Sequence, residues 1–543
     1  MNAAAEKITA SINEGRMLSH LKNFFSKTST VLSECMQNAR RAGATQVEFA
    51  HTGTTLSITD NGCGVTNFKD LITLAGSGWS EEMMASEQPF GVGFFSVCFV
   101  AEKICVESKG KQISFSAEDV IEKHPINIVP SSFIGGTRIT LTGFKMDSKE
   151  IEEALQKYAT GFAIPVVWQG TVLPRPHARE FLDGEETEIG FFHVPGVHDG
   201  KALQPHPWGC SYRQLYYQGL PINPSSRYAE EGPTIVHLES NKFQPRMPDR
   251  DCLVDSESAI DIIHAEEARI WRTHLEAEKT VMSAVDFVER HWGSAEKWRC
   301  LDVMLDVPAI PKSVCWMYGQ MPYITDCGYY YQQRVDKTIT RSEVELGEVT
   351  LVQAPEDAYG FAKAAWVYMQ GCIIVDDLPE GHWAQQHVRN TDSAGVRISG
   401  KVIAVDHFSG NYVDGKVKIV KDLAVSMYGI KHFLHSNGVA VGKEMGYGGE
   451  PTFLIPADRK CACGDVVAQA STYMMENETY DENSYAEDVE AFNNLVSIMS
   501  GEDAVVTLRK CLHEAGASRK KNLSGRSFYV QFDAEGKMTI TAE

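Results

Sequence analysis

The sequence predicts a multidomain α+β protein, and three observations lead to that prediction. The chain has 543 residues, enough for roughly three or four domains. Hydrophobic residues make up 43% of it, so each domain can bury a core. Stretches with helical periodicity alternate with short strands, and no internal repeat is evident. We expect four regions, at residues 1–146, 147–255, 256–300 and 301–543.

The first informative element is a helix that begins after a run of Ser and Thr residues and ends at Gly43. Glu34 and Asn38 lie one turn apart on one face of it, where a carboxylate can polarise a water and an amide oxygen can ligate magnesium. If the helix stood alone, a surface Glu and a capping Asn would be the plainer interpretation. Its apolar residues recur at helical spacing: Val31, Leu32, Cys35, Met36, Ala39 and Ala42.

The next element is a strand that ends at Asp60. Leu56 and Ile58 alternate with polar residues, and Asp60 continues on their face. A buried carboxylate needs a hydrogen-bond donor, and the exocyclic amine of adenine is one. Gly62 and Gly64 remove side chains where the backbone must turn and a flat base must approach. Alternatively, Asp-Asn-Gly is a common hairpin turn that binds nothing.

The third stretch is a glycine loop that leads into an apolar helix. The loop comprises Gly91, Val92, Gly93 and Phe94, and its glycines let backbone amides face a phosphate. Ser96 follows in the first helical turn, where its hydroxyl could reach the same anion. Gly-Val-Gly alone is a weak signal, because many tight turns contain it. The order of the three motifs within about seventy residues is the stronger one.

The three motifs together resemble the GHKL superfamily, which includes gyrase B, the ninety-kilodalton heat-shock chaperone, sensor histidine kinases and MutL. FGVGFFSVCFVAEKICVESK is similar to the chaperone's second glycine box, whereas ARRAGATQVEF is closer to MutL. A fourth stretch, GGTRITLTGF, places Thr137 where the superfamily has a Thr near the adenine. The resemblance implies a Bergerat fold in the region 1–146, an α/β sandwich with a mixed sheet and helices on one face.

The resemblance also implies roles for these residues, with ATP and Mg2+ as cofactors. Glu34 would be the general base, and Asn38 the magnesium ligand. Asp60 would accept the adenine amine, with Thr137 assisting through a water, while the Gly91–Ser96 loop would hold the phosphates. The chain departs from the family at Arg41, where the family usually has an acid.

The region 147–255 resembles a transducer or middle domain by its position. A helix is expected at Lys149–Tyr158, followed by short strands. In the superfamily this domain inserts a cation against the terminal phosphate, and the candidates are Lys242, Arg246 and Arg250. Alternatively, these three pair with aspartates of the same loop.

The remaining regions are a helical linker at 256–300 and a mixed α+β region at 301–543. The linker is expected as one long helix from Ser256 to about His291, with Gly293 ending it. The last region resembles no family, and we expect it to act as an effector or interaction region.

Composition limits the partners and the compartment. The net charge of -21 disfavours a role in binding duplex DNA, and the basic run Arg519–Arg526 is expected to be solvated surface. No apolar run is long enough to span a bilayer, and the first residues lack the features of a signal peptide. Thirteen cysteines without regular spacing fit a cytoplasmic protein. We therefore expect no membrane partner.

The resulting expectation is a chaperone-like ATPase that acts as a nucleotide-gated homodimeric clamp. A protein client or partner is favoured over nucleic acid. The alternative is a nucleotide-sensing scaffold, phage-encoded or defence-associated, that hydrolyses little or no ATP and binds a partner through its C-terminal half. A histidine kinase, a topoisomerase and a MutL endonuclease are disfavoured, because no phospho-acceptor helix, cleavage domain or nuclease metal motif is evident.

Overall fold

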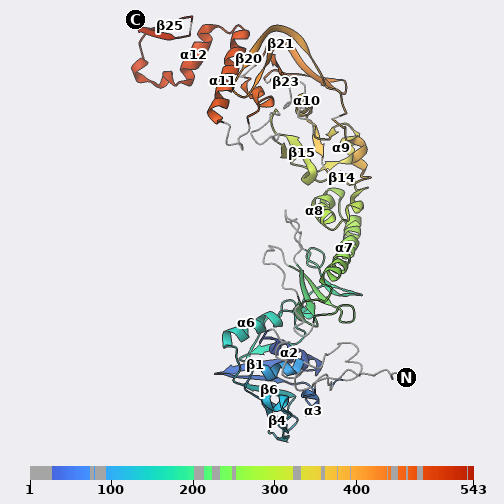
Figure 1. Ribbon diagram of the computed structural model, residues 1–543. Coiled ribbons are helices and arrows are strands. Elements are labelled where there is room, and N and C mark those ends of the chain that lie inside the picture. Colours follow the sequence, from blue (N-terminus) through green and yellow to red (C-terminus); the bar gives the residue numbers. More distant parts are fainter. Residues whose placement is uncertain are drawn as a thin grey trace, which may run out of the picture. The chain divides into compact units, whose positions relative to one another are not determined.

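The computed structural model is a multidomain α+β protein with several sheets, as the sequence predicts (Figure 1). It divides into two compact units, residues 1–281 with 293–300, and residues 282–292 with 301–543. The structure describes residues 27–73, 79, 93–200, 213–222, 233–246, 252–321, 332–355, 361–375, 377–391, 393–436, 438–441, 450–459, 463–473, 481–534 and 536–543.

The first unit begins with an eight-stranded mixed sheet of order β5-β4-β3-β6-β2-β1-β7-β8. All neighbouring strands are antiparallel except β1 and β7, which are parallel. The strands are β1 (Val47–Thr52), β2 (Thr55–Asp60), β3 (Lys103–Ser108), β4 (Lys111–Phe115), β5 (Val129–Pro130), β6 (Thr137–Thr142), β7 (Val166–Trp168) and β8 (Thr171–Val172). The helices of this part are α2 (Thr30–Arg41), α3 (Phe68–Leu71), the 3-10 helix η2 (Gly93–Phe99), α5 (Ala117–Ile121), α6 (Ser148–Ala159) and the 3-10 helix η3 (Arg179–Phe181).

Helices α2 and α6 share one hydrophobic core with this sheet. In α2 the residues Val31, Leu32 and Met36 are fully buried, as their helical spacing predicts. Helix α6 begins with a capping box, in which Asp147 accepts from Glu150 N and Glu150 accepts from Asp147 N. Both helices are therefore fixed against the sheet by apolar packing at defined positions.

The boundary expected at residue 146 does not match the structure. A boundary at residue 146 would place α6 and β7 in the second domain. In the structure, α6 packs in the first hydrophobic core and β7 pairs with β1. The pairing joins Val47 to Val166. Because these residues are far apart in the sequence, the local pattern of apolar residues cannot predict the pairing. The first domain therefore continues to β8.

The second sheet has five strands in the order β12-β11-β13-β10-β9. Its members are β9 (Glu185–Thr187), β10 (Gly190–His193), β11 (Arg213–Tyr217), β12 (Leu220–Ile222) and β13 (Thr234–Leu238). Strands β11 and β13 are parallel, and the other pairs are antiparallel. Every residue of β13 is buried, which is typical of a central strand.

The long helix expected after this sheet is two helices, α7 (Ser256–Val281) and α8 (Ala284–Lys297). The Ser283 hydroxyl accepts from Asp286 N at 3.2 Å and so caps the start of α8. Gly293, expected to end the helix, lies inside α8. Among the described residues, no helix is both long and apolar enough to cross a membrane.

The described residues of the second unit form four further sheets. Strand β14 (Ala309–Ile310) pairs with β17 (Ile339–Thr340), and the next sheet has the order β16 (Gln332–Arg334), β15 (Cys315–Tyr318), β19 (Ile373–Val375), β18 (Leu351–Val352). The largest sheet has the order β20 (Arg397–Ser409), β21 (Asp414–Met427), β24 (Thr452–Pro456), β23 (Val439–Val441), with β22 (Ile430–Phe433) on β21. Strands β25 (Phe528–Phe532) and β26 (Met538–Ala542) form a hairpin.

The α-helices of this unit are α9 (Arg341–Glu345), α10 (Phe361–Gln370), α11 (Glu482–Met499) and α12 (Ala504–Glu514). The 3-10 helices are η4 (Leu301–Met304), η5 (Lys312–Val314), η6 (Trp383–His387), η7 (Gly464–Gln469), η8 (Ala517–Arg519) and η9 (Lys521–Leu523). Helix α10 packs against β21, and α11 packs against η7. The region 301–543 is therefore a mixed α+β region, as expected.

Candidate functional site

Asp60 lies at the end of β2, where two neighbouring segments hold its carboxylate. Its Oδ1 accepts a hydrogen bond from Gly62 N at 2.8 Å. Thr137, its cross-strand partner on β6, donates to the same carboxylate through both its amide and its hydroxyl. Burial raises the pKa of Asp60, and these hydrogen bonds oppose that shift. Asp60 is thus a fixed and partly desolvated hydrogen-bond acceptor.

The turn after Asp60 has room only for glycine at two positions. A Cβ on Gly62 would lie 2.7 Å from Ala42 Cβ, at the end of α2. Gly64 has a φ of +70°, and a Cβ there would lie 2.6 Å from Ser108 Oγ. Between them, Cys63 N donates to Ala42 O at 2.8 Å. The turn is therefore bonded to the helix that carries Glu34 and is held close to β3.

Glu34 is 6% exposed on α2 and lies against the start of η2. A Cβ on Gly93 would come within 2.0 Å of Glu34 Oε2, so Gly93 is needed for the carboxylate to occupy this position. Asn38 follows one helical turn later and is half-buried. The first and third motifs of the sequence therefore meet in space, at the carboxylate of Glu34.

Cys35, on α2, lies within electrostatic range of the carboxylates of both Glu34 and Asp60. It is buried between α2 and the sheet, and burial raises the pKa of its thiol. The charges of Glu34 and Asp60 both add to this rise in pKa. A thiol held neutral in this way packs as a small apolar group.

Ser96 lies in η2, a 3-10 helix at the position where the sequence predicts an apolar helix. Its side chain is only 2% exposed, and its Oγ has no hydrogen-bond partner among the described residues. A buried hydroxyl without a partner is unusual, because it loses hydrogen bonds to water. Phe94 is half-buried in the same helix. Gly91 and Val92, the other loop residues of the prediction, lie outside the described residues.

The second sheet contacts α2 through Gln218, at the turn between β11 and β12. Gln37 Nε2 donates to Gln218 O at 2.8 Å, and Arg41 Nη2 donates to Gln218 Oε1 at 3.1 Å. Gln37 is 1% exposed and Arg41 is 6% exposed. Arg41, the departure from the family pattern, thus binds the second sheet. The Glu34 helix is in this way connected to the second sheet by two buried side chains.

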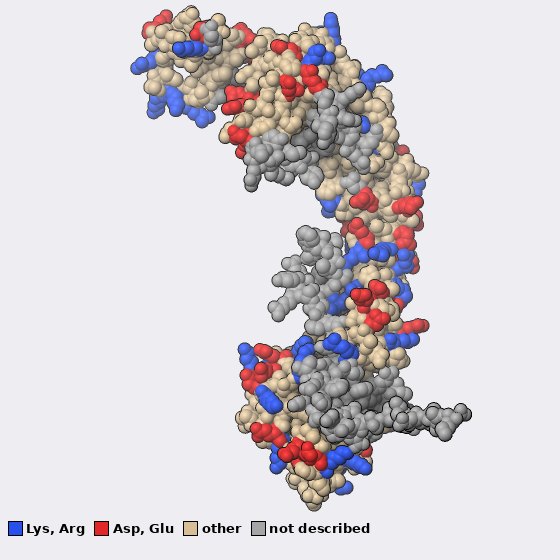
Figure 2. Space-filling model, viewed as in Figure 1, with Lys and Arg blue, Asp and Glu red and all other residues tan. Residues whose placement is uncertain are grey.

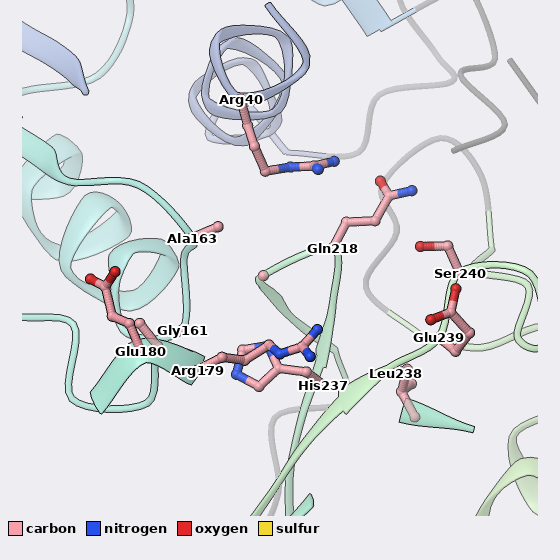
Figure 3. A pocket seen from close by; sticks show the side chains of 12 residues that line it. Arg40, Gly161, Ala163, Arg179, Glu180, Gln218, His237, Leu238, Glu239 and Ser240 are labelled. Carbon is pink, nitrogen blue, oxygen red and sulfur yellow. The ribbon is translucent and has the colours of Figure 1, made fainter. Parts of the chain in front are cut away.

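A cavity of about 360 Å3 lies beside this contact. Figure 3 shows Arg40 and Gln218 extending into the same space, with Arg179 beside His237. Burial lowers the pKa of His237 to about 4, so its ring is neutral near pH 7. Its Nε2 therefore carries the proton donated to His177 O, over 2.7 Å. The full lining is Arg40, Gly161, Ala163, Ala178, Arg179, Glu180, Gln218, Gly219, His237, Leu238, Glu239 and Ser240.

Of the three cations proposed to reach the terminal phosphate, the structure describes Lys242 and Arg246. Lys242 is exposed in a turn, which is closed by a hydrogen bond from Lys242 N to Glu239 O. Arg246 is exposed beside the bridge between Pro245 and Leu253. Arg250 lies outside the described residues. Gln218, which the sequence analysis did not identify, contacts α2 through Gln37 and Arg41. Its Gln-Gly pair indicates only a hairpin turn.

No protein-family model matches this chain, and no curated protein matches it. The residues fit a nucleotide at three points: Asp60 offers a half-buried acceptor for an amine, Ser96 offers a buried hydroxyl without a partner among the described residues, and Gly93 leaves space at the Glu34 carboxylate. Asn38 supplies an amide oxygen, a donor type that suits Mg2+.

Proposed function

We propose that the first domain binds and hydrolyses ATP as a GHKL-type module with a Bergerat fold. The observation that carries the proposal is that the turn after Asp60 packs against the end of α2, while Glu34 on the same helix lies against Gly93. These groups come from separate stretches of the sequence. Their meeting supports a shared site more strongly than any one motif does.

Each residue then has a defined role. Asp60 accepts the adenine amine, and the Thr137 hydroxyl orients the Asp60 carboxylate directly. Ser96 and the Gly91–Phe94 loop bind the phosphates. Asn38 would hold Mg2+, which neutralises phosphate charge when it is bound. Glu34 orients the attacking water and accepts its proton.

The proposed cycle is that of a homodimeric, chaperone-like clamp acting on a protein client. The contact between Gln218 and α2 supports a conformational change on nucleotide binding. A shift of α2 would move the second sheet, because Gln37 and Arg41 of that helix bond to Gln218. A cation from Lys242, Arg246 or Arg250 would complete the site only in the closed state. The alternative, a nucleotide-sensing scaffold, shares the binding step and lacks turnover.

The test compares ATP turnover and nucleotide affinity in the wild type, Glu34→Ala and Asp60→Asn. Glu34→Ala is expected to retain nucleotide binding and to lose turnover by about 10²-fold to 10⁴-fold, the usual contribution of a general base. Asp60→Asn is expected to weaken binding by about 10-fold to 100-fold, because it replaces a charged acceptor. Glu153→Ala, an exposed carboxylate on α6, is the matched control.

Three outcomes separate the proposals. Selective loss of turnover in Glu34→Ala, with loss of binding in Asp60→Asn, supports the ATPase. Nucleotide binding with negligible turnover that Glu34→Ala leaves unchanged supports the scaffold. Failure of the wild type to bind any adenine nucleotide contradicts both. Light scattering with a non-hydrolysable ATP analogue then tests for the homodimer.

A further inference from the structure

Residues 504–543, which we name the C-terminal segment, pack differently from the rest of the chain. The segment comprises α12, η8, η9 and the β25–β26 hairpin. No described side chain of the segment is buried. A two-stranded hairpin is marginally stable by itself in water, so a face left open on it points to a binding partner.

The hairpin has one apolar face and one polar face. The cross-strand pairs Phe528–Ala542, Val530–Ile540 and Phe532–Met538 share one face, because strand side chains alternate. The opposite face carries the pairs Tyr529–Thr541 and Gln531–Thr539. Phe532, Met538 and Ile540 on the apolar face are 53%, 52% and 52% exposed. This face is therefore a continuous apolar surface in contact with water.

Helix α12 adds a second apolar surface. Val505 and Leu512 are exposed, and Leu508 between them is partly exposed. Their spacing places all three on one side of the helix, with Arg509 next to the stripe. Leu523, in η9, is a further exposed apolar side chain between α12 and the hairpin. Apolar groups are thus exposed along the whole segment.

The same segment is basic in an acidic chain. The segment contains seven Lys or Arg residues and four Asp or Glu residues, a net charge of +3, whereas the whole chain carries -21. Its basic residues concentrate in 504–526, which contains six Lys or Arg residues and one Glu. Figure 2 shows Lys and Arg side chains gathered over this segment. Within residues 504–526 the exposed cations whose side chains are described are Arg509, Arg519, Lys520, Lys521 and Arg526, and none forms an ion pair with a described residue. These charges are therefore available to an anionic partner.

Three kinds of partner could cover such a surface, and only one accounts for both properties. Single-stranded nucleic acid would pair with the cations and stack on Phe528 and Phe532, but it would leave Val505, Leu512 and Ile540 against polar groups. A second copy of the chain would bury the apolar face, but it would bring two basic surfaces together. An anionic lipid surface offers acyl chains to the aliphatic groups and headgroups to the cations.

We propose that the C-terminal segment binds the surface of membranes that contain anionic lipids. The apolar face of the hairpin and the stripe of α12 enter the headgroup boundary, and the five cations contact lipid phosphates and carboxylates. This binding lies in the plane of the interface and needs no membrane-spanning helix. It is independent of the proposed ATPase, since no residue of the Glu34 site takes part. It would also replace two expectations, that Arg519–Arg526 is solvated surface and that the protein has no membrane partner.

The experiment is flotation of the full chain with two kinds of vesicle in about 0.15 M salt. One contains phosphatidylcholine alone, and the other also contains about 30% phosphatidylserine. The charge variant is Lys520→Glu with Lys521→Glu, and its control is Lys416→Glu with Lys418→Glu on β21. The apolar variant is Phe528→Ser with Ile540→Ser, and its control is Ile403→Ser with Val405→Ser on β20, where both side chains are more than half exposed.

We expect binding to the anionic vesicles, little binding to phosphatidylcholine, and weaker binding at higher salt. Each lost cation should lower vesicle affinity by about 5-fold, so the charge variant should lose at least about 25-fold. The apolar variant should also lose binding, while both controls should keep it. Exposed lysines leave folding intact when reversed, so the charge variant remains informative if the apolar variant misfolds.

Several results would overturn the proposal. The first is the absence of flotation with anionic vesicles, and the second is flotation that neither variant changes. The third is binding of a thymidine oligonucleotide that depends on the same residues and competes with no vesicle, which would assign the segment to nucleic acid. The fourth is a dimer in light scattering that only the apolar variant dissociates, without any vesicle binding, which would assign the face to a second copy.

Discussion

Replacement of Gly93 by Ala tests the central contact of the site. An ideal Cβ at this position lies 2.0 Å from Glu34 Oε2 and 2.6 Å from Glu34 Cδ. Ordinary contact begins at 3.4 Å, so the Glu34 carboxylate must move by about 1.4 Å. Gly93 is not among the glycines with positive φ, so Ala fits its backbone conformation and the perturbation is purely steric.

The magnitude follows from the size of this displacement. Overpacking of a well-packed site lowers the free energy of unfolding by about 1–3 kcal/mol. A displacement of about 1 Å in a catalytic group lowers the rate on the order of 10²-fold. We therefore expect Gly93→Ala to lose both stability and ATP turnover. The predicted loss of stability does not depend on whether the protein hydrolyses ATP.

A double-mutant cycle with Glu34→Ala measures the contact. Urea unfolding and ATP turnover are recorded for the wild type, both single variants and the double variant. Because Glu34→Ala removes the colliding atoms, Gly93→Ala should cost almost nothing further in that background. Gly395→Ala is the control, since no atom lies within 4 Å of its Cβ position and its φ is not positive. Equal destabilisation by Gly93→Ala in both backgrounds would refute the argument.

Three further predictions concern pH and packing. Burial raises the pKa of Asp60, so its protonation should begin to weaken adenosine binding at a higher pH than for an exposed Asp. Calorimetric titration with adenosine across pH measures this, and an affinity that does not change with pH would contradict the acceptor role. His237 has a folded-state pKa of about 4 against an ordinary 6.5, so the unfolded chain binds more protons between these values. Stability should therefore fall by up to about 3 kcal/mol as pH drops from 6.5 to 4, and urea unfolding of His237→Gln should show a flatter profile. Asp488, which is 2% exposed, accepts from Asn411 N at 2.6 Å and Tyr412 N at 2.8 Å, so Asp488→Ala should lower the free energy of unfolding by about 3 kcal/mol. Asp481→Ala, at the exposed start of the same helix, should lose clearly less in thermal unfolding, and an equal loss would count against the buried contacts.

The residues of the candidate site were predictable because their constraints are local. Asp60 ends a strand with clear alternation, and the glycines that follow it are needed within the same turn. Glu34 and Asn38 are neighbours on one helix, which its periodicity identifies. The resemblance of GGTRITLTGF to a superfamily motif predicts that Thr137 lies near the adenine. In the structure Thr137 on β6 pairs with Asp60 on the neighbouring strand β2. The predictable residues are thus mostly those whose role depends on neighbours in the same helix, strand or turn.

The errors concern contacts between distant positions or choices between similar local conformations. Gln218 reaches α2 from a turn of another sheet, and nothing in its own sequence neighbourhood reports that contact. The break between α7 and α8 depends on capping by Ser283, a weak signal inside a long apolar periodicity. The 3-10 geometry of η2 differs from an α-helix by one residue in its hydrogen-bond spacing, and its apolar pattern suits both.

The parallel pairing of β1 with β7 determines when the first domain can form during synthesis. Strand β1 gains its second neighbour only after Trp168 has left the ribosome, more than a hundred residues after β1 itself was made. Until then, that side of β1 is an open edge, and α6, which precedes β7 in the chain, is also made late. A fragment cut at residue 146 would keep this open edge permanently and should aggregate. A fragment that continues past β8 should remain soluble.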